Sequence, residues 1–332
     1  KPMKTHLYHN SQMEQELHSK IDAAANERHG GAVPADVQER ITAEKQHIFS
    51  NGHGTLLAVA AKLAEFSESR GCPVGFRGLT GNLYLSHLLG LAAVDPMELG
   101  LRWEGCLGLD GTRTPQFILN VAGGLLEDMA AYLGELLPGY DPGGEHPAIR
   151  LCPHALMDRI WEARRAGSAP AVGDLLSDGS LVVRAYRDDV AGIPVLGDLE
   201  GFQDLARQLE PESFSDLVKI MGLCLAPEVW FQAERLMGQP DRFQRLIGTR
   251  EDVYDLCVRH GVGGDDAFHV MRQACHGRLS PEYKDMLAAH GISGLPWDTL
   301  CAAGYLYPRG QCADYMYWAL ALLARELCPC QV

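Results

Sequence analysis

The sequence lacks the features that would place it in a common catalytic or structural class. No apolar stretch of about 18 residues free of charge occurs, so we expect no membrane span. The ten cysteines form no CxxC pair, which favours free thiols in a reducing, cytoplasmic environment over disulfides or a zinc site. A GxSxG elbow, an HExxH helix and a GxxxxGK(S/T) loop are all absent. The common hydrolase, metalloprotease and P-loop signatures are therefore excluded.

Positive charge is also scarce. Lysine and arginine total 29 against 43 aspartate and glutamate residues, and the formal net charge is −14. Proteins that grip nucleic acid through phosphates usually carry a basic surface, so this charge disfavours DNA binding except through a local basic groove. An acidic surface also suits a basic protein partner.

Helical periodicity dominates what is present. The chain has 332 residues, 46% of them hydrophobic, which is enough for a substantial core and two domains. We expect short strands at residues 72–74 and 116–121 and a loop over residues 139–147. The predicted helices are 12–28, 35–50, 55–70, 81–91, 125–136, 153–165, 199–209, 213–221, 228–237, 242–247, 251–260, 265–275, 281–290, 298–303 and 311–327.

The segment GFRGLTG, residues 75–81, lies between a predicted strand and a predicted helix. Its glycines, Gly75 and Gly78 among them, let backbone N–H groups approach an anion. The partial positive charge at the helix start also favours an anion, and Arg77 can donate two hydrogen bonds to the same phosphate. A glycine-rich turn with a solvated arginine explains the same string, so both interpretations stay open.

Several histidines and cysteines fall in one helical region. No two of these histidines have the i, i+4 spacing that places a pair on one helix face, so we expect solvated or core histidines and no metal site. The residues are Cys257, His260, His269, Cys275, His276 and His290.

A series of segments follows an order shared with a known family. The first are VPADVQERITAEKQHIFSNGHG (33–54), GCPVGFRGLTGNLYLSHLLGLAAVDP (71–96) and EGCLGLDGTRTPQFILNVAGG (104–124). The later ones are SFSDLVKIMGLCLAPEVW, IGTREDVYDLCVRHG, GRLSPEYKDML and YLYPRGQCADYMYWALAL. Together they resemble the PolC-type alpha subunit of DNA polymerase III, a bacterial C-family replicative polymerase: the first group its palm, the second its helical fingers.

The resemblance implies an α+β, predominantly helical fold. A small mixed-sheet, palm-like domain with N-terminal helices is expected in residues 1–165, and an all-helical, fingers-like domain in residues 175–332. The stretch between them, AGSAPAVGD at residues 166–174, is a predicted linker that replaces the family's thumb and third palm carboxylate.

The family's two palm aspartates fall on Gln116 and Ile118. Residues two apart on a strand share a face, and Mg²⁺ at that face would need carboxylate oxygens that an amide and a branched alkane do not supply. We therefore expect a catalytically inactive pseudo-polymerase with a binding or structural role in DNA replication, without cofactor or metal. The resemblance implies phosphate- or nucleotide-binding positions at Gly75, Arg77, Gly78, Arg250, Arg278 and Arg309.

Two alternatives remain open. One is an active DNA-directed DNA polymerase, a nucleotidyltransferase whose Mg²⁺ is held by displaced carboxylates at Asp110, Glu127 or Asp128. The other is a protein-interaction module that binds no nucleotide. The expected partners are a replication protein and, weakly, nucleotide or DNA. The sequence leaves open the oligomeric state and whether the chain is a piece or a decaying copy of a longer gene.

Overall fold

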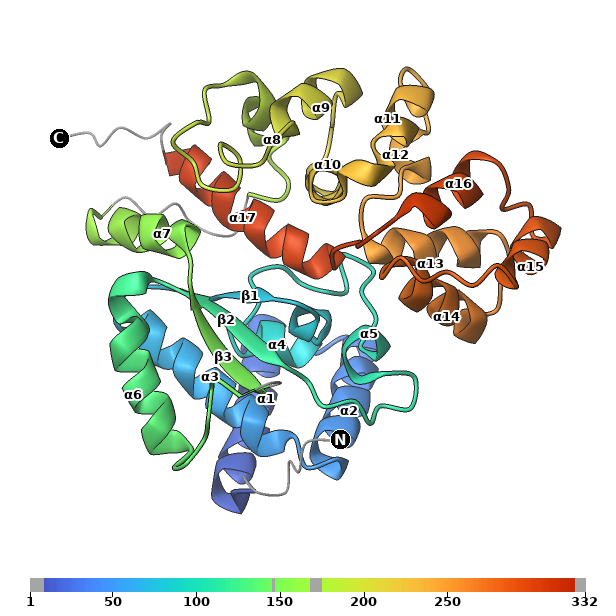
Figure 1. Cartoon of the computed structure of the whole chain (residues 1–332). Helices are drawn as coiled ribbons and strands as arrows, with labels where there is room; N and C mark the ends of the chain where they lie inside the picture. Colours follow the sequence, from blue (N-terminus) through green and yellow to red (C-terminus); the bar gives the residue numbers. More distant parts are fainter. Residues whose placement is uncertain (1–8, 145–146, 168–174, 326–332) are drawn as a thin grey trace. The chain divides into compact units, whose positions relative to one another are not determined.

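The computed structural model describes residues 9–144, 147–167 and 175–325. The chain divides into two compact units, Lys1–Ala169 and Pro170–Val332 (Figure 1). The described fold is α+β and predominantly helical, with one three-stranded sheet. Residues 168–174, most of the predicted linker, lie outside the described residues, and the replacement of a thumb by this segment stays a prediction.

The first unit begins with three helices that match the predicted ones to within one residue. Asn10 caps the first, because its side chain accepts the N–H of Met13 at 3.1 Å. The third is apolar along most of its length and is buried between the first helix and the sheet region. These helices are α1 (Ser11–Arg28), α2 (Ala35–Ser50) and α3 (Gly54–Ser69).

The sheet has the order β1-β2-β3, with β1 antiparallel to β2 and β2 parallel to β3. The strands are β1 (Gly75–Arg77), β2 (Phe117–Val121) and β3 (Ile149–Pro153). The expectation of a small mixed sheet is therefore confirmed. The core face carries Phe76, Leu119 and Leu151 in register, and helices α3 and α6 (Leu126–Leu136) pack against this part of the unit (Figure 1).

The strands depart from the sequence prediction in three ways. The first strand begins after the predicted 72–74, since Pro73 has no N–H to donate to a ladder. The second begins at Phe117, which leaves Gln116 outside the strand. The third was not expected, because IRLCP is short, has little alternation and ends in a proline.

The predicted helix over residues 81–91 is much shorter in the structure. The extended backbone of Leu83, with ψ 126°, separates one 3-10 turn from a single helical turn. The helical elements that complete the first unit are η2 (Thr80–Asn82), α4 (Tyr84–Leu88), α5 (Glu104–Leu107), η3 (Gly123–Leu125) and α7 (Ala155–Arg165).

The described residues of the second unit form helices and connecting segments, without a strand. The long, buried helix α17 packs on α10 and α8, and α13 packs on α14. None of the helices in the described part of the chain is long and apolar enough to cross a membrane. The elements are α8 (Gly179–Arg187), α9 (Phe202–Leu209), α10 (Phe214–Cys224), η4 (Pro227–Val229), α11 (Phe231–Leu236), α12 (Arg242–Arg245), α13 (Arg250–Arg259), α14 (Gly264–Ala274), α15 (Tyr283–Ala289), α16 (Leu295–Ala302) and α17 (Arg309–Arg325).

Candidate functional site

The face of the sheet opposite the core face carries two arginines. Arg77 of β1 lies opposite Ile118 of β2, and Ile118 lies opposite Arg150 of β3. Because strand side chains alternate between faces, one row of this face reads arginine, isoleucine, arginine. We call this surface the arginine face; it comprises Gly75, Arg77, Ile118, Asn120, Arg150 and Cys152.

A buried amide holds Arg77 in place. Asn120 is 1% exposed, and its Oδ1 accepts a hydrogen bond from Arg77 Nε at 2.7 Å. The Nδ2 of Asn120 donates to the carbonyl oxygen of Phe76 at 3.3 Å. This pair fixes the guanidinium through Nε, and its terminal nitrogens have no hydrogen-bond partner among the described residues.

A histidine and a carboxylate lie at the carboxyl ends of β2 and β3. The backbone N–H of His154 donates to Val121 O at 3.0 Å, and its ring Nδ1 accepts the N–H of Leu156 at 3.2 Å and so caps α7. Burial, followed by the positive charge of Arg77, lowers the pKa of His154. Asp158 accepts the N–H of Gly123 at 2.7 Å. Because its pKa is lowered, the His154 ring is neutral near pH 7, and only a neutral ring can accept the N–H of Leu156 at Nδ1.

The two positions at which the sequence resemblance predicts the family's aspartates differ in structure and burial. Gln116 is exposed and precedes β2, whereas Ile118 is half-buried within it. Within the described ranges no group of three His, Cys, Asp or Glu residues could hold a metal ion. The polar groups of the arginine face are guanidinium and amide, which suit an anion better than a hard cation.

The displaced carboxylates of the alternative hypothesis are not brought together. Asp110 precedes β2 and accepts the N–H of Thr112 at 3.1 Å. Glu127 and Asp128 follow the other end of the strand, on α6, where Asp128 pairs with Arg70 at 3.4 Å. A five-residue strand is about 13 Å long, so these side chains start from opposite ends of β2.

The glycine-rich segment, residues 75–81, does not present the free helix start that the sequence led us to expect for anion binding. Gly78 has φ +85°, a conformation that favours glycine, and Gly75 lies opposite Asn120 in the sheet. The helix start that follows is already occupied. The carboxylate of Glu44 accepts the N–H groups of Tyr84 at 2.8 Å and Leu85 at 2.9 Å, so these donors are not available to a phosphate.

The three arginines of the second unit do not form one cluster. Arg309 Nη2 donates to Asp255 at 2.6 Å and to Asp252 at 3.0 Å. Arg250 is 5% exposed and lies 3.9 Å from Glu251, whose Oε2 accepts the backbone N–H of Arg309 at 2.7 Å. Arg250 and Arg309 therefore belong to one buried ion-pair network.

Arg278 lies elsewhere, exposed in the turn after α14. No side-chain partner of Arg278 lies within hydrogen-bond distance among the described residues. The phosphate-binding roles of Arg250, Arg278 and Arg309 stay predictions.

Sequence reasoning missed three residues of this site: Asn120, Arg150 and His154. The alternation FILNV places Asn120 on the same face as Ile118, and a polar residue inside an apolar strand is a signal that could have been used. Arg150 and His154 depend on β3, which the sequence did not predict.

Comparisons with known proteins bear on the first unit. Residues 15–136 match the family described as bacterial DNA polymerase III alpha NTPase domain. The DNA polymerase III PolC-type of Mycoplasmopsis pulmonis is 29% identical over 135 residues. The PolC-type proteins of Pediococcus pentosaceus and Bacillus subtilis are each 25% identical over 134 residues.

Residues 15–136 are thus similar to a DNA polymerase III alpha domain. The matched region includes Gly75, Arg77, Gly78, Gln116 and Ile118. The matches support a PolC-like family and no specific member of it. They cover 39–40% of this chain but 9% of the length of these relatives. The likeness of the second unit to polymerase fingers stays a prediction.

Proposed function

We propose that this polymerase III alpha-like chain binds phosphate groups on its arginine face without a divalent metal and does not catalyse nucleotidyl transfer. The observation that carries the proposal is the row Arg77, Ile118, Arg150 on the sheet. It includes one of the two positions where the family is expected to carry metal-binding aspartates. The role would be binding or structural, in bacterial DNA replication, with a nucleotide, a nucleic acid strand or a replication protein as partner.

The charge of the arginine face supports this function. Metal-assisted phosphoryl transfer relies on cations held by acidic oxygens, and two guanidinium groups disfavour a divalent cation in the same row. Those groups attract phosphate instead, and arginine binds phosphate oxygens in a bidentate manner. Asn120 orients Arg77 for this purpose through the 2.7 Å bond to Nε.

Binding is tested with a labelled single-stranded oligonucleotide and with dATP, each in EDTA and in Mg²⁺. We expect binding in EDTA to be no weaker than in Mg²⁺, and a loss of about tenfold or more in Arg77→Gln. The matched control is Arg70→Gln, an exposed arginine paired with Asp128 on α6. Absence of any nucleotide or oligonucleotide binding would favour a protein-interaction module.

Catalysis is tested by primer extension in Mg²⁺ and in Mn²⁺, where we expect no turnover. Turnover that is lost in Gln116→Ala, Asp110→Asn or Asp128→Asn would overturn the proposal in favour of an active polymerase with displaced ligands. Turnover unaffected by all three changes would indicate a contaminating enzyme, which a mock preparation from cells that do not express this chain distinguishes.

A further inference from the structure

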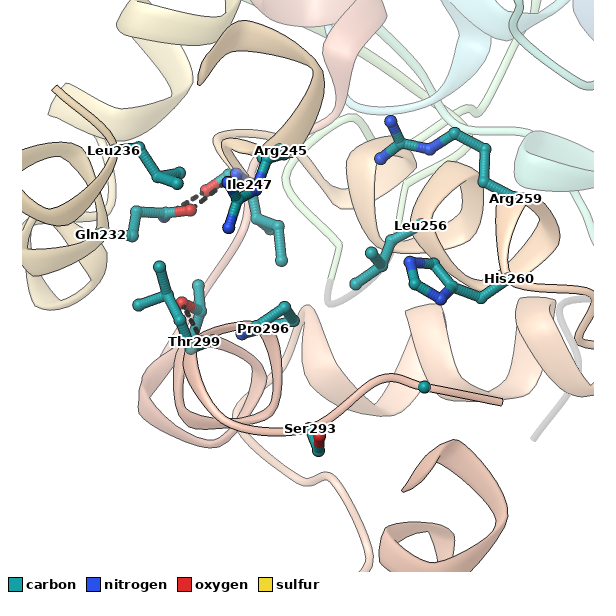
Figure 2. A pocket seen from close by; sticks show the side chains of 12 residues that line it. Gln232, Leu236, Arg245, Ile247, Leu256, Arg259, His260, Ser293, Pro296 and Thr299 are labelled. Carbon is teal, nitrogen blue, oxygen red and sulfur yellow. Dashed lines mark hydrogen bonds between the residues drawn. The ribbon is translucent and has the colours of Figure 1, made fainter. Parts of the chain in front are cut away.

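A pocket of about 360 Å³ opens in the second unit among α11, α12, α13 and α16 (Figure 2). This volume falls within the usual range of small-molecule sites, about 300–1,000 Å³. The α13–α16 pocket, as we call it, is lined by Gln232, Leu236, Arg245, Ile247, Leu256, Arg259, His260, Gly291, Ser293, Leu295, Pro296 and Thr299.

Part of the pocket lining is apolar, and its buried polar residues, Gln232 and Thr299, are already paired. Leu236 and Ile247 are 1% and 2% exposed. The amide of Gln232 makes two 2.8 Å hydrogen bonds with the backbone of Ile247, and Thr299 Oγ1 donates to Leu295 O at 2.8 Å. An apolar ligand group placed here would therefore leave no buried polar atom without a partner.

The charged residues that line the pocket are basic. Arg245 comes from α12 and Arg259 from α13, so that the two guanidinium groups reach the pocket from different elements (Figure 2). No aspartate or glutamate belongs to the described lining. Arg245 Nη1 donates to Gln239 Oε1, and the carboxylate of Asp241 lies 3.8 Å from the same nitrogen and is about half exposed. Asp255, one turn before Arg259, instead binds Arg309 at 2.6 Å.

From this combination we infer that the α13–α16 pocket binds a small organic anion. A phosphate or carboxylate head would lie between Arg245 and Arg259, and an apolar body would pack against Leu295 and Pro296, the half-buried apolar residues of the lining. The guanidinium groups provide charge-assisted hydrogen bonds to the head, and burial of the body supplies the apolar contribution. The inference does not depend on the arginine face.

Calorimetric titration of the full chain tests this with four probes. These are 1-naphthyl phosphate, 1-naphthoate, 1-naphthol and inorganic phosphate. We expect one-to-one binding of at least one aryl anion, with naphthol and inorganic phosphate about tenfold weaker or more. The tighter of the two aryl anions identifies the head group. Failure of both to saturate, or equal affinity for naphthol, would overturn the inference.

Two substitutions locate the site. Arg245→Gln and Arg259→Gln should each weaken the aryl anion by about tenfold or more, and both residues are exposed enough for the fold to be retained. Arg235→Gln is the matched control, because Arg235 is exposed on α11 but does not line the pocket. Unchanged binding in both pocket variants, or an equal loss in Arg235→Gln, would place the anion elsewhere and refute the inference.

Discussion

Ile118 lies between two arginines on the neighbouring strands, Arg77 and Arg150. A carboxylate introduced at this position would therefore pair with arginine rather than bind a metal ion. In Ile118→Asp the new carboxylate would lie about 5 Å from each neighbouring strand position and would pair with Arg77 and Arg150. We expect no gain of Mg²⁺ binding and a loss of about tenfold or more in oligonucleotide affinity.

The control for this change is Ile118→Val, which keeps a branched apolar side chain and should leave both affinities unchanged. Calorimetry with Mg²⁺ and with the oligonucleotide measures both. If Ile118→Asp bound Mg²⁺ and extended a primer, the arginine face would still be a working palm that had lost only its ligands.

His154 makes the stability of the first unit depend on pH. Burial, then the charge of Arg77, lowers its pKa from the ordinary 6.5, and Asp158 opposes this only in part. The stabilising contribution of the neutral ring is complete above pH 6.5 and is lost as the pH falls through the lower pKa of the folded state. We expect urea midpoints to fall between pH 7.5 and pH 5.5.

His154→Asn separates this titration from the cap. Asparagine also accepts the N–H two residues on at a helix start but does not titrate, so the variant should show a flatter pH dependence. The stability of the variant will still depend on pH to some extent, because burial and then the charge of Arg28 lower the pKa of His87 as well. A variant slope equal to that of the parent protein would show that His154 does not contribute.

At the scale of elements, a buried carboxylate connects α2 to the start of α4. Glu44 is fully buried, accepts Arg40 Nε at 2.5 Å, and accepts two backbone N–H groups of α4. Arg40 in turn donates to Leu101 O at 3.0 Å and Asn82 O at 2.6 Å. Glu44 thereby holds in place the segment that follows the glycine-rich loop.

Glu44→Ala should therefore destabilise the protein by about 3–5 kcal/mol, because it leaves Arg40 without its counter-charge, and Arg40 Nε and two backbone N–H groups without their acceptor. Glu44→Gln keeps one acceptor oxygen and should cost less. Glu39→Ala, on the exposed side of the same helix, should change the free energy of unfolding by no more than about 0.5 kcal/mol. Denaturant unfolding measures all three, and equal effects of Glu44→Ala and Glu39→Ala would contradict the prediction.

A second ion-pair network joins α13 and α17. Asp252 is buried, which alone would raise its pKa, but Lys219 at 2.9 Å and Arg309 at 3.0 Å hold the pKa well below its ordinary value. Arg309→Met removes one of these cations and should cost about 3–5 kcal/mol of unfolding free energy.

The control is Arg207→Met, an exposed arginine paired with Asp204 on the surface of α9. Its loss should cost no more than about 1 kcal/mol. Because Asp252 is stabilised in its ionised form, the parent should lose this stabilisation as the pH falls below about 3.8, and Arg309→Met should lose less of it, so that the difference between them shrinks in acid. A constant difference down to pH 2 would show that packing, and not charge, explains the loss.

The long helices could be predicted from the sequence because their apolar spacing is a local property. Helices α1 to α3 begin and end within one residue of prediction. Strand β3 could not be predicted in this way, because a strand of five residues with a terminal proline is defined by its pairing with β2 and not by its own pattern. The same limit applies to the candidate site. The glycines around Arg77 mark it as a candidate residue in the sequence, whereas only the register of the strands shows that Asn120 and Arg150 share its face of the sheet.

For the whole molecule, the net charge of −14 opposes the approach of any polyanion. Binding to a nucleic acid strand must then depend on a few basic contacts, for which the arginine face offers Arg77 and Arg150. Each phosphate neutralised on a single strand contributes about 0.7 to the slope of log K against log salt. Two contacts therefore predict a slope of about −1.4.

Fluorescence anisotropy with a labelled single-stranded oligonucleotide over a range of KCl concentrations measures this slope. Arg77→Gln should reduce its magnitude by about 0.7, whereas Arg70→Gln should leave it unchanged. A parent slope of about −5 or steeper would require roughly seven phosphate contacts, far more than this face provides. That result would locate binding on a wider basic surface and would refute the arginine face as the binding site.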